Sequence, residues 1–125
     1  MTRVVVVDDE KVIASTVAAI LQMNGFSAKF FVHPLQALDA MNIEHPDLLI
    51  SDVMMPELSG VELAIRVKAL SPSCKILLFS GQAATADLLL QARAKGHDFQ
   101  LLAKPIHPTE LLSRVGGLVG KAVTE

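Results

Sequence analysis

Short apolar runs alternate five times with amphipathic segments of helical spacing along this chain of 125 residues. The runs are rich in Val, Leu and Ile, as is typical of strands that are buried on both faces of a sheet. Strict alternation of strands and helices predicts a parallel sheet with helices on both of its faces, an α/β fold. The expected strands are Arg3–Val7, Ala28–Val32, Asp47–Asp52, Lys75–Phe79 and Phe99–Ala103.

The segments between these runs carry helix boundary signals. Pro34 and Pro108 suit the first position of a helix, and Ser59 with Glu62 three residues later indicates a capping box. Gly116-Gly117 interrupts the last helical pattern, so the sequence does not fix the residue at which this helix ends. The residues expected to face the core include Val12, Val17 and Leu21 in the first helix, Leu35, Leu38 and Met41 in the second, Val61, Ile65 and Leu70 in the third, and Leu111, Val115 and Leu118 in the last.

The composition narrows the classes of function. With 51% hydrophobic residues, a chain of this length can bury a core of its own and is not expected to be disordered. Aromatic residues make up 4% and the net charge is −2, which favours neither base stacking nor binding of a polyanion. The single Cys74 fits a reducing compartment, and the Val4–Val7 run is too short for a signal core or a membrane span. We therefore expect a cytoplasmic domain with no direct nucleic-acid or membrane partner.

Polar residues stand where four of the five expected strands end. Asp8 and Asp9 follow the first strand, Asp52 ends the third, Ser80 follows the fourth and Lys104 follows the fifth. The carboxyl ends of parallel strands meet at one edge of the sheet, where such folds bind ligands. Each residue alone has an ordinary explanation as a turn, cap or solvated residue. Their convergence at one edge is harder to explain in that way.

The converging residue types point to phosphoryl chemistry. Carboxylates in one cleft repel one another by on the order of a few kcal/mol per pair at an effective dielectric of about 20. Mg²⁺ relieves this repulsion, because it binds one or two carboxylates and bridges to phosphate. A carboxylate can act as a nucleophile and form an aspartyl phosphate, while a hydroxyl and an ammonium stabilise the charge of the transferred group. We therefore predict a phosphoryl acceptor at Asp52, with Ser80 and Lys104 as the stabilising groups.

Over essentially its whole length, the chain resembles the receiver domains of bacterial response regulators. The matching residues are Asp8-Asp9 after a Val run, Asp52 followed by Met55-Pro56 and Gly60, Ser80-Gly81, and Lys104-Pro105. The resemblance implies a flavodoxin-like (βα)5 three-layer sandwich with a five-stranded sheet of order 2-1-3-4-5. It also implies a phosphoacceptor switch of a two-component phosphorelay rather than an enzyme. One receiver domain over residues 1–125, with no effector domain in this chain, is then expected.

The resemblance also implies roles for single residues. Asp52 would take a phosphoryl group from a phosphohistidine on a sensor histidine kinase or a histidine phosphotransfer protein. Ser80 and Lys104 would contact the phosphoryl oxygens, and the Lys104-Pro105 bond would be cis. Met54 and Gln82 would border the site and tune how fast the phosphoryl group is lost; the apolar Met54 predicts a long-lived phosphorylated form. The implied Mg²⁺ ligands are Asp8, Asp9, Asp52 and the backbone carbonyl of Met54.

The implied output is a change in the face formed by the fourth helix, the fifth strand and the fifth helix, which would control a downstream protein or form a dimer. Here the chain departs from the family pattern. Three residues before the lysine, the usual aromatic switch is replaced by Leu101, and Phe99 lies two residues earlier. Both side chains are expected on the same face of the strand. Phe99 either replaces the switch through a shifted register or belongs to the core, and the second interpretation is favoured.

Two other classes share parts of this pattern. Phosphatases of the haloacid dehalogenase type also combine Asp, Ser or Thr, Lys and an acidic pair. Their nucleophile ends the first strand and has a second Asp two residues on, whereas here Asp52 ends the third strand and Met54 follows. A flavodoxin-like cofactor binder is disfavoured, because the acidic strand ends would repel a flavin phosphate. The sequence does not decide among three outputs: docking to another protein, relay of the phosphoryl group, and a role within a longer chain.

Overall fold

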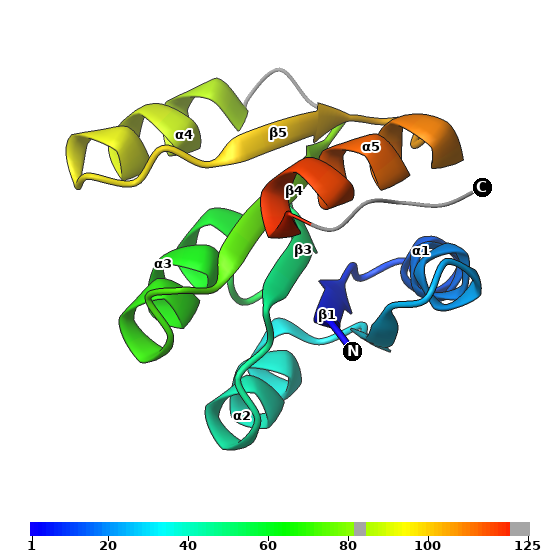
Figure 1. Cartoon of the computed structure of the whole chain (residues 1–125). Helices are drawn as coiled ribbons and strands as arrows, with labels where there is room; N and C mark the ends of the chain where they lie inside the picture. The colour runs from blue at the N-terminus through cyan, green and yellow to red at the C-terminus, as the bar shows by residue number, and fades with distance from the viewer. Residues whose placement is uncertain (82–84, 121–125) are drawn as a thin grey trace.

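One parallel sheet runs through the molecule, with its strands in the order β2-β1-β3-β4-β5 (Figure 1). The computed structural model describes residues 1–81 and 85–120. The strands are β1 (Arg3–Val7), β2 (Ser27–Phe31), β3 (Leu48–Asp52), β4 (Lys75–Ser80) and β5 (Gln100–Ala103). The helices are α1 (Lys11–Met23), α2 (Pro34–Ile43), α3 (Gly60–Leu70), α4 (Thr85–Ala94) and α5 (Pro108–Val119). The predicted fold class and strand order are confirmed.

The helices lie in two layers, with α1 and α5 on one face of the sheet and α2, α3 and α4 on the other (Figure 1). Successive strand residues point to opposite faces, so Val4 and Val6 of β1 pack towards α1 and α5, whereas Val5 and Val7 pack towards α2 and α3. This alternation divides the interior into two cores. The α1/α5 core includes Val4, Val6, Val17, Leu21, Leu77, Leu102, Leu111 and Val115. The α2–α4 core includes Val5, Val7, Ala37, Met41, Leu49, Leu63, Val67 and Leu78.

Three large residues that were predicted to face the core are exposed instead. Val12 is 77% exposed, Leu35 44% and Leu70 36%. In α1 and α2, small buried residues such as Ala14 and Ala37 lie on the inner face. A prediction from the spacing of large aliphatic side chains misses such a face. Alanine can form it, because its small side chain lets a helix approach the strands closely.

The element boundaries differ from the prediction by small shifts. Strand β2 lies one residue earlier than expected, and Phe99 precedes β5 rather than opening it. Helix α5 continues through Gly116-Gly117 and ends at Val119, so the glycine pair does not stop it. In the described part of the chain, no helix is both long enough and apolar enough to cross a membrane.

Gly60, the first residue of α3, lies directly against the end of β3. Its N–H donates to the carbonyl of Val53 at 2.8 Å. The preceding N-cap residue, Ser59, accepts a hydrogen bond from the backbone N–H of Glu62 at 3.1 Å, which confirms that half of the predicted capping box. A Cβ at Gly60 would overlap the backbone carbonyl of Asp52. Glycine is therefore required for α3 to start this close to the strand end.

Replacing Gly60 by Ala should destabilise the protein, because the new methyl group overlaps backbone atoms at the end of β3. We expect the free energy of unfolding to fall by at least about 2 kcal/mol, as measured by urea denaturation. Gly117→Ala is the control, since Gly117 is exposed within α5 and a Cβ there meets open space. It should raise the free energy of unfolding by roughly 0.5–1 kcal/mol. Equal stability of Gly60→Ala and the wild type would contradict this account.

Candidate functional site

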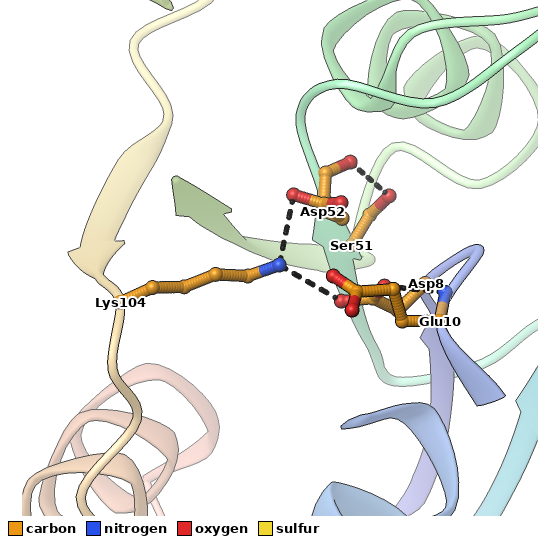
Figure 2. Close-up of polar contacts among 5 residues, drawn as sticks. All are labelled: Asp8, Glu10, Ser51, Asp52 and Lys104. Carbon is orange, nitrogen blue, oxygen red and sulfur yellow. Dashed lines mark hydrogen bonds and ion pairs between the residues drawn. The ribbon is translucent and has the colours of Figure 1, made fainter. Parts of the chain in front are cut away.

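Lys104 places its ammonium group between two buried carboxylates at the carboxyl edge of the sheet (Figure 2). Its Nζ lies 3.2 Å from Oδ2 of Asp8 and 3.4 Å from Oδ1 of Asp52. Asp8 is 0% exposed and Asp52 7%. The three residues come from the ends of β1, β3 and β5, so the structure brings them together as the sequence predicts.

Backbone groups hold Asp8 in place for these ion pairs. Its Oδ1 accepts a hydrogen bond from the N–H of Glu10 at 2.9 Å, and its own N–H donates to the carbonyl of Phe31 at 3.2 Å. One carboxylate oxygen therefore meets a backbone N–H while the other meets Lys104. A buried carboxylate needs such partners to offset the loss of water.

The pKa values of Asp52 and Lys104 are both raised, but for different reasons. Burial raises the pKa of Asp52 above its ordinary value of 3.8, Asp8 raises it further, and Lys104 offsets part of the shift. Burial alone would lower the pKa of Lys104, but the carboxylates of Asp8 and Asp52 outweigh it and raise this pKa above 10.5. Lys104 is therefore a cation at neutral pH. An additional cation beside Asp52 would favour its ionised form.

Asp9 completes a cluster of three acidic residues with Asp8 and Asp52. One carboxylate oxygen from each residue lies within 4.8 Å of the others. Asp9 is exposed whereas Asp8 and Asp52 are buried, so the cluster opens to solvent on the side of Asp9. Oxygen donors at this spacing fit a hard divalent cation such as Mg²⁺. Met54, whose carbonyl was predicted as a further ligand, lies in the loop after β3 and is 44% exposed.

Ser80 and Lys104 are held beside each other by the end of the β4–β5 ladder. The N–H of Lys104 donates to the carbonyl of Ser80 at 3.0 Å, and Ser80 is 7% exposed. Gly81 lies next to the lysine, since a Cβ there would be 3.5 Å from Cβ of Lys104, an ordinary contact distance. The Lys104-Pro105 bond is cis, as the resemblance implies. Gln82 lies outside the described residues.

Ser51 contributes to the site but was not among the predicted residues. Its Oγ donates to the carbonyl of Asp52 at 2.9 Å, and the residue is fully buried (Figure 2). Gly60 approaches the same carbonyl from the start of α3. The available signal was a hydroxyl next to Asp52 at the end of an apolar run, which indicates a local hydrogen bond that must be satisfied.

Comparison with known proteins identifies the family of this chain. The chain matches the family model of the response regulator receiver domain over residues 4–116. The transcriptional regulatory protein CreB of Escherichia coli K12 is 35% identical over 113 residues, which cover 90% of this chain and 48% of CreB. The response regulator MprA of Mycobacterium tuberculosis is 29% identical over 123 residues, which cover 98% of this chain and 53% of MprA. The high-resolution structure of the chemotaxis response regulator CheY4 of Vibrio cholerae superimposes with a TM-score of 0.80 at 27% identity, covering 94% of this chain and 98% of that chain.

This chain belongs to the response regulator receiver family. Receiver domains are switches of two-component signalling and are generally not turnover enzymes. They bind Mg²⁺ at an acidic pocket, and the cluster of Asp8, Asp9 and Asp52 has the donor atoms for such a pocket. The chain spans about half the length of the curated relatives described above.

The raised pKa of Asp52 predicts how stability depends on pH. The native protein keeps a proton on Asp52 over a pH range in which the unfolded chain has lost it. This stabilising contribution is complete below the ordinary pKa of 3.8 and is lost as the pH rises through the raised value. Asp52→Asn removes the disfavoured charge, so it should raise the free energy of unfolding on the order of 1 kcal/mol at neutral pH.

Urea denaturation without divalent cations measures this difference, which should vanish near about pH 3, where the carboxyl group is protonated in both states. Asp39→Asn, an exposed position in α2, is the control and should change the free energy of unfolding by less than about 0.5 kcal/mol at either pH. An Asp52→Asn protein that is less stable than the wild type at neutral pH would refute the electrostatic argument.

Proposed function

We propose that this protein is the phosphoacceptor switch of a two-component phosphorelay in the bacterial cytoplasm. Asp52 takes a phosphoryl group from a phosphohistidine on a sensor histidine kinase or a histidine phosphotransfer protein. The observation that carries the proposal is the position of the Lys104 ammonium between Asp8 and Asp52, next to the exposed Asp9. The acceptor carboxylate thus has acidic neighbours that suit a metal cation and a fixed cation that suits a phosphoryl anion.

Asp52 is the nucleophile in this proposal. One of its carboxylate oxygens attacks phosphorus, the P–N bond to the donor imidazole breaks, and the electron pair of that bond stays on the ring nitrogen. Lys104 stabilises the negative charge that arrives, and the hydroxyl of Ser80 donates a hydrogen bond to a phosphoryl oxygen. Asp8, Asp9, Asp52 and the backbone carbonyl of Met54 would hold Mg²⁺, which would supply further neutralisation of the phosphoryl charge.

Treatment with acetyl phosphate and Mg²⁺ should add one phosphoryl group to the wild-type protein and none to Asp52→Asn, because the amide cannot act as the nucleophile. Intact-mass spectrometry detects the added group, and chelation of Mg²⁺ should prevent its addition. Asp39→Asn, the exposed position in α2, serves as the matched control and should be labelled like the wild type. Equal labelling of Asp52→Asn would place the acceptor elsewhere.

For the output, we propose that phosphorylation changes the face formed by α4, β5 and α5, which then acts on a downstream protein or pairs with a second copy. Ser80 ends β4, and β4 is the neighbour of β5 in the sheet. Leu90 of α4 is 60% exposed, so this helix offers an apolar contact to a partner. A shift at Ser80 can therefore be passed to the proposed docking surface through the neighbouring strand β5.

Phe99 and Leu101 bear on how this face responds. Both pack against the α2–α4 core, so they lie on the same side, as strand alternation predicts. Phe99 precedes β5, and His97 stacks on it with ring centroids 5.4 Å apart. This packing supports the interpretation of Phe99 as a core residue. We infer that the output works without an aromatic switch at position 101.

Met54 should determine how long the phosphorylated form lasts. Its thioether is a weak hydrogen-bond acceptor and cannot orient an attacking water as an amide can. Met54→Asn should therefore shorten the half-life of the aspartyl phosphate, measured by intact mass after removal of the donor. Met23→Asn, at an exposed position in α1, is the control and should leave the half-life unchanged. An unchanged decay rate in Met54→Asn would disprove this role.

A further inference from the structure

The parallel sheet ends at two edge strands, β2 and β5, and a helix side chain caps a backbone carbonyl on each of them. At the β2 edge, Nε2 of Gln22 in α1 donates to the carbonyl of Ala28 at 2.8 Å. At the β5 edge, Nη1 of Arg114 in α5 donates to the carbonyl of Leu101 at 3.3 Å. The two contacts lie at opposite borders of the sheet, so each has formed independently of the other.

Both capped carbonyls point out of the sheet. In a parallel sheet, a residue that bonds to one neighbouring strand is followed by a residue whose peptide groups face the opposite side. The N–H of Ser27 and the carbonyl of Phe31 bond to residues that flank β1, so Ala28 between them faces outward. The N–H of Lys104 bonds to the end of β4, so Leu101, three residues earlier, also faces outward.

A cap on an outward carbonyl changes what another strand can gain at that edge. An edge strand with unpaired peptide groups is a template for a strand of another molecule. Where the carbonyl is capped, the added strand must break one hydrogen bond before it forms its own, so it gains no net bond there. Arg114 also places a positive charge at the β5 edge, and charges at an edge disfavour strand addition.

The β2 edge also carries apolar surface that would favour association. Phe30, the next outward residue after Ala28, is 37% exposed. Exposed apolar surface beside outward peptide groups is a site for strand pairing between molecules. The partner that such pairing would bring is a second copy of this chain, because every copy carries the same two edge strands.

We propose that Gln22 and Arg114 are autoinhibitory caps that prevent strand pairing between copies of this protein. Gln22 closes the β2 edge, and Arg114 closes the β5 edge. Each cap comes from a helix of the α1/α5 layer, so the edges stay closed only while these helices are packed on the sheet (Figure 1). The caps do not depend on the phosphoacceptor function of Asp52.

Gln22→Met and Arg114→Met test this role, because methionine removes the donor and keeps a long unbranched side chain of similar helix propensity. In the unphosphorylated protein, each substitution should lower by about fivefold the concentration at which the chain associates, since pairing no longer breaks a hydrogen bond. Sedimentation velocity measures this concentration. Hydrogen exchange of the associated protein should show new protection at residues 27–31 in Gln22→Met and at residues 100–103 in Arg114→Met.

Two matched controls make the same substitutions away from the sheet edges. Gln36→Met and Arg66→Met lie at exposed positions in α2 and α3 and should associate like the wild type. Unchanged association of both cap variants would overturn the proposal. Equal association of the controls would also overturn it, because the effect would then come from added apolar surface. So would association without new protection at the edge strands, since the copies would then pair elsewhere.

Discussion

The site depends on one cation that is shared by two buried carboxylates. Asp8 and Asp52 lie close to each other in the interior, where two unpaired negative charges would be strongly disfavoured. The ammonium of Lys104 lies within 3.4 Å of both. It can do so because the parallel sheet brings the ends of β1, β3 and β5 to one edge in a fixed register. The electrostatics of the site therefore depend on the strand order.

The fold could be predicted largely from periodicity, because five strand–helix alternations leave few arrangements other than a parallel sheet. The bounds of β1 were predicted correctly, and the other strands were shifted by about one residue or less. The exposure of Val12 and Leu35 could not be predicted, because alanines form the buried faces of α1 and α2. Burial of a small residue depends on how closely a helix approaches the sheet, and sequence periodicity does not encode that distance.

The convergence of Asp8, Asp52 and Lys104 could also be predicted, since residues at parallel strand ends share an edge whatever the details of packing. The contacts of Ser51 and Gly60 with the carbonyl of Asp52 could not. They depend on the backbone path of the β3–α3 loop, which the order of residue types does not specify.

The edge position of β5 gives these ion pairs a second consequence. This strand has four residues and lies at the border of the sheet, beside β4. Short edge strands open more readily than central ones, because fewer contacts hold them. Lys104 directly follows β5 and binds the carboxylates of Asp8, which directly follows β1, and of Asp52, which ends β3, across the width of β4. The ion pairs thus fasten the border of the sheet to its centre, and the charge state of Asp52 becomes a control on how often that border opens.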